Sequence, residues 1–267
     1  MSEPVISVVI PCYNHGQYID EAIQSVEENQ YRDYEIIIID DGSTDDLTNK
    51  RLKELKDKKY NVIFQENQGV SKARNNAIRL AKGKYILPLD ADNKIKPDLI
   101  SKAIKILDAN PSISIIYSDR QLFGNSKGID KTGRFELPFL IKQNYIDTCA
   151  IYRKKVWEEI GGYDDLESWE DWDFWLSVAE KGFRFFYIPE PLFYYRVLED
   201  SKIHSFMKSS SASSLKERIH KKHIALILRE TERLRIELKT ARRHPLRTMR
   251  KHLYKKIRDI YRAKFNG

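Results

Sequence analysis

The sequence predicts an α/β fold with a mostly parallel sheet flanked by helices. Two runs of apolar, largely β-branched residues, at 5–10 and 34–39, are typical of strands buried on both faces. Weaker strand patterns at 61–64 and 85–89 follow, and helical patterns occur at 17–28, 47–57 and 71–81. This alternation of strand and helix predicts a doubly wound parallel sheet, whose strands end along one shared edge.

The second part of the sequence is less regular. Expected helices lie at 97–109, 154–160 and 169–181, expected strands at 113–117, 183–188 and 192–196, and a turn-rich hairpin at 121–132. Gly83 is expected to stop the helix at 71–81, and Gly161 the helix at 154–160. Residues 209–214, five serines and one alanine, are interpreted as a polar linker. Two further helices are expected, at 215–238 and after Pro245.

The charge is unevenly distributed. The chain has a formal net charge of +8, yet residues 209–267 carry 18 Lys or Arg against five Asp or Glu, which leaves the preceding residues at −5. We therefore expect an α/β domain at 1–208 and a basic helical C-terminal extension at 209–267, whose partner is anionic.

The end of this extension has an amphipathic pattern. Its apolar residues fall on one helical face, between basic ones: Leu246, Met249, Leu253, Ile257 and Ile260. Such a helix can lie on an anionic membrane surface, or pack on protein, including in a homodimer. Nucleic acid is a third partner for a basic helix, and we do not expect it here. The N-terminal residues do not have the pattern of a signal peptide, and we expect no transmembrane stretch. We therefore expect a cytoplasmic protein, with a peripheral position on the inner face of the cell membrane as the alternative.

Acidic residues follow two of the expected strands. Asp41 ends the second strand region, and Asp90 and Asp92 follow the fourth. Ligands of such sheets bind at this edge. In an extended segment Asp90 and Asp92 would point the same way and repel unless a cation lay between them, which favours a Mn²⁺ or Mg²⁺ site. The alternative is an Asp-rich turn without a metal.

The order of several motifs resembles the family 2 glycosyltransferases with the GT-A (Rossmann-like) fold. The segments are SVVIPCYNHGQYIDEAIQSV, YEIIIIDDGSTDD, ENQGVSKARNNAIRLAKGKYILPLDADN and GGYDDLESWEDWDFWLSVAEKGFRFFYIPEPLFYYR. The resemblance runs from about residue 5 to residue 196. It implies an inverting enzyme of the hexosyltransferase type that uses a nucleoside diphosphate sugar.

The resemblance also implies roles for matching residues. Asp171 matches the catalytic base, and Glu170 would orient the base or the acceptor. Asp92 matches the metal ligand. Five residues match the nucleotide site: Pro11, Tyr13, Asp41, Arg74 and Asp90.

The sequence departs from the family pattern at the metal site. Many relatives have a histidine two residues after the arginine that matches Arg196, where this chain has Leu198. His204 lies eight residues after Arg196 and is the alternative metal ligand. The other interpretation of His204 is an ordinary surface residue.

For several aromatic residues, for Arg74 and for the cysteines, a structural role is an alternative interpretation. Trp172 and Trp175, three residues apart on an expected helix, fit packing, whereas Trp169 could equally wall the acceptor site. Tyr13 and Arg74 could be ordinary packing and surface residues. Cys12 and Cys149 are expected to be small buried hydrophobic residues rather than nucleophiles.

We therefore expect a metal-dependent inverting glycosyltransferase that moves a sugar from a UDP-sugar, or another nucleoside diphosphate sugar, to a hydroxyl of a glycan or lipid-linked acceptor. By analogy with the family, the product would be a bacterial surface polysaccharide. One alternative is a sugar nucleotidyltransferase, although the first loop, PCYNHGQY, has one glycine and no basic residue for a triphosphate. The other is a non-catalytic sugar- or membrane-binding protein on the same fold.

Overall fold

The computed structural model describes residues 3–199, 206 and 209–243. The chain divides into two compact units, one ending at Ile219 and one beginning at His220. The expected boundary between residues 208 and 209 stays a prediction, because several residues on its N-terminal side lie outside the described ranges. In the described part of the chain, no helix is both long and apolar enough to cross a membrane.

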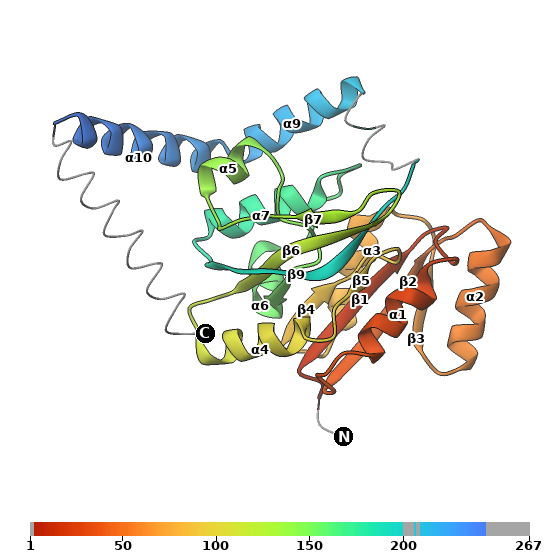
Figure 1. The fold of residues 1–267 in the computed structure, drawn as a ribbon. Coiled ribbons are helices and arrows are strands. Elements are labelled where there is room, and N and C mark those ends of the chain that lie inside the picture. The colour runs from red at the N-terminus through yellow and green to blue at the C-terminus, as the bar shows by residue number, and fades with distance from the viewer. Residues whose placement is uncertain (1–2, 200–205, 207–208, 244–267) are drawn as a thin grey trace. The chain divides into compact units, whose positions relative to one another are not determined.

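Within the described residues, nine strands form one sheet in the order β3-β2-β1-β4-β8-β6-β9-β5, with β7 paired to β6 (Figure 1). The first four strands are β1 (Ile6–Cys12), β2 (Tyr34–Asp41), β3 (Asn61–Gln65) and β4 (Tyr85–Pro88). They run parallel, so the N-terminal half of the sheet has the predicted organisation.

The second half of the sheet mixes directions. Its strands are β5 (Lys94–Ile95), β6 (Ile115–Gly124), β7 (Gly128–Asp130), β8 (Ile151–Arg153) and β9 (Phe185–Val197). β6 and β9 are parallel, whereas β8 is antiparallel to both β4 and β6, and β5 is antiparallel to β9. The expected hairpin is the β6–β7 pair.

The helices of the N-terminal half are α1 (Ile19–Glu27), α2 (Asp46–Asp57), α3 (Val70–Leu80) and α4 (Leu99–Ala109). Alternate residues of β1 are buried on opposite faces of the sheet. Ile6 and Val8 belong to a core cluster with residues of α1 and α4, and Val9, which points to the opposite face, is also fully buried. The run at 5–10 is therefore apolar throughout, as expected for a strand covered on both faces.

The remaining helices are α5 (Leu137–Lys142), α6 (Lys154–Ile160), α7 (Glu170–Glu180), α9 (Ser210–Lys222) and α10 (Ile224–Arg243). α6 ends at Gly161 in the left-handed conformation (φ 89°), as predicted. The expected helix at 215–238 is divided between α9 and α10. The amphipathic segment after Pro245 lies outside the described residues.

Three local expectations were wrong. The two strands expected at 183–188 and 192–196 form the single strand β9, in which register shifts opposite Asp119 accommodate the proline-containing stretch between Ile188 and Phe193. The serine-rich segment at 209–214 is not a linker. It begins α9, because Ala212 and Leu215 lie three residues apart and are both buried.

Gly83 is the third correction. α3 ends at Leu80, and Ala81 is already extended, so the glycine does not terminate the helix. A Cβ at Gly83 would lie 2.5 Å from the backbone nitrogen of Ser7. The glycine is therefore required for close packing of the α3–β4 connection against β1.

Candidate active site

The carboxyl ends of β1, β2 and β4 meet at one edge of the sheet, where the sequence predicted a ligand crevice. Cys12 at the end of β1 pairs with Asp40 of β2, and Leu89 after β4 donates its backbone N–H to Val9 of β1. Pro11 is buried within β1, and Tyr13 is the first residue after it. Pro11, Tyr13, Asp41 and Asp90 therefore come from neighbouring strand ends.

Asp41 is already engaged by the protein. Its Oδ1 accepts hydrogen bonds from Gln65 Nε2 (2.7 Å) and Gln68 N (2.9 Å), and its Oδ2 accepts one from Gly69 N (2.9 Å). An ionised carboxylate has roughly four acceptor positions, so one remains for a ligand. Asp41 fixes the connection that leads into α3.

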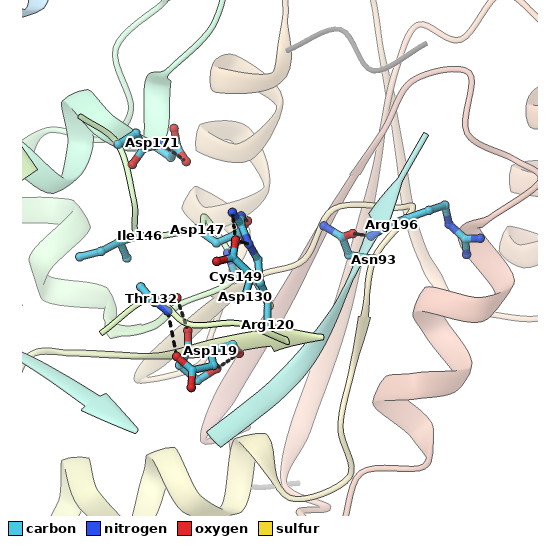
Figure 2. A network of polar contacts seen from close by, with 12 residues as sticks. Asn93, Asp119, Arg120, Asp130, Thr132, Ile146, Asp147, Cys149, Asp171 and Arg196 are labelled. Carbon is cyan, nitrogen blue, oxygen red and sulfur yellow. Dashed lines mark hydrogen bonds and ion pairs between the residues drawn. The ribbon is translucent and has the colours of Figure 1, made fainter. Parts of the chain in front are cut away.

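Asp90 and Asp92 lie in a turn rather than in the extended segment that the sequence suggested. The backbone N–H of Asn93 donates to the carbonyl of Asp90 over 3.0 Å, which closes the turn. Arg196 of β9 fixes the other side, because its Nε donates to the Asp92 carbonyl over 2.9 Å. Its backbone N–H donates to Asn93 Oδ1, also over 2.9 Å (Figure 2). Burial, and then the charge of Asp90, raise the pKa of Asp92 to about 7.

Arg74 connects the two halves of the site. From α3, its Nη2 donates to Asp90 Oδ1 over 2.7 Å and its Nη1 to Glu170 Oε1 at the start of α7. Its side chain is 4% exposed. Removing one partner of such a buried ion pair typically costs about 3–5 kcal/mol of stability. Arg74 thus ties the Asp90–Asp92 turn to the first turn of α7, an arrangement that the sequence did not predict.

Asp171 follows Glu170 in the first turn of α7. Its Oδ2 accepts a hydrogen bond from Asn144 Nδ2 (2.9 Å), and its Oδ1 accepts one from the backbone N–H of Trp172 (2.8 Å). Burial, followed by the neighbouring Glu170 charge, raises the pKa of Asp171 to about 7. A carboxylate with a pKa near neutrality is suited to general base catalysis.

The segment between α5 and β8 adds two polar residues that sequence reasoning missed, Asn144 and Asp147. Asp147 Oδ1 accepts a hydrogen bond from Cys149 N (2.9 Å), and Oδ2 accepts one from Arg120 Nη1 (3.3 Å). Figure 2 shows Asp147 beside Arg120 and Cys149. The segment NYIDTC has no motif that separates these two residues from an ordinary polar turn, and only tertiary structure brings them to the site.

The carboxylates after β4 suit a divalent cation. Asp92 is the less engaged of the pair, because Arg74 occupies one oxygen of Asp90. Burial first, and then the charge of Asp90, raise the pKa of Asp92, and Arg196 offsets them only in part. In the part of the chain that the structure describes, no group of three or more Asp, Glu, His or Cys side chains is placed to hold a metal ion. His204 lies outside the described residues.

Two of the tryptophans are packing residues. Trp172 and Trp175 are buried, and their indole nitrogens donate to the carbonyls of Leu140 (2.6 Å) and Ile146 (3.1 Å). Trp169 is half-buried and stands edge-on to Trp172, with ring centroids 5.6 Å apart. It adopts a left-handed conformation (φ 56°) immediately before α7, next to the Glu170–Asp171 pair.

The two cysteines are buried free thiols. Burial raises the pKa of Cys12 to about 12 and the pKa of Cys149 well above its ordinary value. Both are therefore protonated and unreactive near neutral pH, as predicted for small buried hydrophobic residues.

Comparison with known proteins identifies the class to which this fold and site belong. Residues 7–161 match the model of glycosyl transferase family 2. The chain belongs to this family of glycosyltransferases, and the mixed sheet with its flanking helices is the GT-A fold.

A relative from Haemophilus influenzae, described as an uncharacterised glycosyltransferase, is 31% identical over 235 residues, 80% of this chain and 72% of the relative. Three other relatives are much longer than this chain. The matching part of this chain spans only 20% to 31% of their length.

Two solved structures share the fold at low sequence identity. Residues 1–349 of Staphylococcus aureus TarS, in complex with UDP-GlcNAc, superpose with a TM-score of 0.62 at 19% identity, covering 82% of this chain and 71% of that one. The mannosyltransferase PcManGT of Pyrobaculum calidifontis, in complex with GDP-Man and Mn²⁺, gives a TM-score of 0.58 at 18% identity, covering 84% and 70%.

Proposed function

We propose that this protein is a metal-dependent inverting glycosyltransferase that uses a nucleoside diphosphate sugar, with UDP as the nucleotide. The observation that carries the proposal is the Arg74 bridge, which holds the Asp90–Asp92 turn and the Glu170–Asp171 pair together. Family membership and the nucleotide-sugar complexes of the two structural neighbours support it.

In this proposal the nucleotide occupies the edge formed by β1, β2 and β4. Pro11 and Tyr13 wall the base, and the remaining acceptor position of Asp41 takes a hydrogen bond from the uracil N–H. Asp90 faces the ribose. Arg74 is committed to Asp90 and Glu170, so it positions these carboxylates and the start of α7 rather than binding the diphosphate as a free cation.

Asp92 would hold Mn²⁺ or Mg²⁺ together with the donor diphosphate, and His204 is a further candidate ligand. When bound, the cation neutralises the negative charge that builds up on the leaving diphosphate. Asp92 itself contributes an anionic oxygen from a turn that Arg196 and Asn93 fix in place. Such fixed positioning reduces the rearrangement needed during the reaction.

Asp171 would act as the general base. It accepts the proton of the acceptor hydroxyl while that hydroxyl attacks the anomeric carbon and the nucleoside diphosphate leaves. Asn144 holds one carboxylate oxygen, and Glu170, held by Arg74, fixes the start of the helix that carries the base. A single base opposite the leaving group gives one displacement and inverts the anomeric configuration. Trp169 would wall the acceptor.

The acceptor proposed here is a glycan or lipid-linked glycan of a bacterial surface polysaccharide. A measurement of UDP release with Mn²⁺ and with EDTA separates this proposal from the alternatives. A nucleotidyltransferase would release pyrophosphate instead, and a non-catalytic binding protein would release neither product.

The basic C-terminal extension would place the enzyme at an anionic membrane surface. In the described part of this extension, α10 exposes several large apolar side chains, namely Ile224, Leu228, Leu234, Ile236 and Leu238. Packing in a homodimer is the alternative for these side chains.

Deletion of residues 245–267 should leave donor cleavage intact and reduce binding to anionic vesicles. Each basic residue near such a surface contributes about 1 kcal/mol, and this attraction fades as the Debye length falls from about 10 Å at 0.1 M salt to about 3 Å at 1 M. Vesicle flotation of the full-length and truncated proteins at both salt concentrations measures the effect. Equal flotation of the two proteins would contradict membrane binding by this segment.

A further inference from the structure

The side chain of Asn14 ties the loop after β1 to the turn after β2. Cys12 and Asp40 are the last paired residues of these two parallel strands. Beyond this pair, Asn14 Oδ1 accepts hydrogen bonds from the backbone N–H groups of Thr44 (2.8 Å) and Asp45 (3.3 Å), and Asn14 Nδ2 donates to Thr44 Oγ1 (3.1 Å). The amide of Asn14 therefore continues the connection between β1 and β2 past the end of their ladder.

The backbone of Asn14 takes part in the same connection. Its φ is 55°, in the left-handed region, which asparagine tolerates better than most other residues with a Cβ atom. Its backbone N–H donates to Ser43 Oγ over 3.0 Å. Backbone and side chain of Asn14 thus both bind the turn after β2, and they fix the chain directly after Tyr13.

This turn is held on its other sides as well. Gly16 N donates to Thr48 Oγ1 in the first turn of α2 over 2.7 Å, and a Cβ at Gly16 would lie 2.4 Å from Thr48 Cα. Asp41, at the end of β2, accepts hydrogen bonds from the backbone N–H groups of Gln68 and Gly69 in the connection to α3. The loops that follow β1, β2 and β3 are therefore joined to one another before any ligand binds.

The two groups that contact the base in our proposal lie on either side of the Asn14 connection. Tyr13 directly precedes Asn14, and Asp41 directly precedes the turn that Asn14 binds. The position of the Tyr13 side chain relative to the Asp41 carboxylate therefore depends on Asn14. Fixing both groups in advance lowers the ordering cost of binding. It also penalises a base whose size or donor position does not fit both groups at once.

We propose that Asn14 is a positioning residue that determines the nucleobase selectivity of the donor site. This inference rests on the proposed function, because it assigns the base to Tyr13 and Asp41. Asn14 acts through these two residues and does not itself contact the base. A purely structural role would lower the melting temperature of an Asn14 variant but leave the relative affinities of different nucleotides unchanged.

Calorimetric affinities of UDP, CDP, ADP and GDP for the full-length protein in Mn²⁺ test the inference. Asn14→Gly keeps the left-handed backbone conformation but removes the side-chain hydrogen bonds to Thr44 and Asp45. We expect the affinity for the nucleotide that the wild type prefers to fall by about 10-fold, and the other affinities by less than about 3-fold. A wild type without a base preference would overturn the inference, while UDP release from a UDP-sugar would still uphold the proposed function.

Two further variants separate the side-chain contacts from general effects. Asn14→Asp can still accept from the N–H groups of Thr44 and Asp45, and its added charge acts on every nucleoside diphosphate alike, so selectivity should remain. Lys59→Gly is the matched control, because Lys59 is also left-handed (φ 69°) but is exposed and precedes β3, at the end of that strand opposite the site. It should leave all four affinities unchanged.

Thr44→Val repeats the test at an exposed position with little risk to folding. It removes only the acceptor of Asn14 Nδ2, so selectivity should fall by about 2- to 3-fold. Wild-type selectivity in Asn14→Gly, or in Thr44→Val if Asn14→Gly does not fold, would contradict the role of Asn14. An equal loss of affinity for all four nucleotides, or the same loss of selectivity in Lys59→Gly, would also overturn it.

Discussion

Replacement of Asp171 by asparagine should lower sugar transfer by about 10²–10⁴-fold, the usual contribution of a positioned general base. The amide has nearly the same shape but cannot accept the proton of the acceptor hydroxyl. Donor binding should remain, because Asp171 lies on α7, away from the strand ends that hold the nucleotide in our proposal. Initial rates and UDP affinity, measured for the variant and the wild type, separate the two effects.

Asp165→Asn is a suitable control, since this exposed carboxylate pairs only with Lys72 in the described structure and should leave the rate unchanged. A loss of UDP affinity in Asp171→Asn would indicate that Asp171 belongs to the donor site. A wild-type rate of transfer would exclude Asp171 as the general base.

The pH dependence of kcat should also report the ionisation of the Asp171 carboxylate. Burial and Glu170 raise its pKa to about 7, and only the deprotonated carboxylate can act as a base. Activity should therefore rise as pH increases through about 7 at saturating donor and Mn²⁺. A rate that is flat from pH 5 to pH 8 would be inconsistent with a base of this pKa.

Asp92→Asn should abolish the stimulation by Mn²⁺ and lower transfer by at least about 10²-fold, because a charge-stabilising group at the leaving diphosphate is lost. The neutral amide is a weaker ligand for a hard cation than the carboxylate. UDP affinity should weaken in the presence of metal and change little in EDTA. Calorimetric titration of UDP under both conditions, together with UDP release, measures these effects.

Asp98→Asn serves as the control for Asp92→Asn. Asp98 precedes α4 and pairs with Lys102, so its removal should not alter the metal response. Unchanged turnover and Mn²⁺-dependent UDP binding in Asp92→Asn would exclude Asp92 as the metal ligand.

Strong hydrophobic periodicity made the N-terminal half of the fold predictable. The runs that became β1 and β2 are buried on both faces, and their composition alone favours parallel strands. β5 and β8 were not predicted, since two or three residues are too few to show a period. The start of α9 was missed because serine is common in turns, whereas burial of Ala212 and Leu215 stabilises the helix here.

The positions of the candidate site residues follow from the sequence only in part. The acidic residues after β2 and β4 could be placed at the sheet edge, since parallel strands end there together. The Arg74–Glu170 ion pair joins residues 96 positions apart and depends on how α7 packs. Asn144 and Asp147 belong to an irregular segment between α5 and β8, and no local pattern indicates which of its side chains face the site.

One measurement tests the proposed chemistry most directly: proton NMR of an α-linked UDP-sugar during cleavage by the wild-type protein, with Mn²⁺ and with EDTA. Water replaces the acceptor in this assay, so the spectrum reports the nucleotide product and the anomer of the released sugar together. We expect UDP and the β-anomer to appear first, and only with the metal. Initial release of the α-anomer, or metal-independent cleavage, would contradict an inverting, metal-dependent glycosyltransferase.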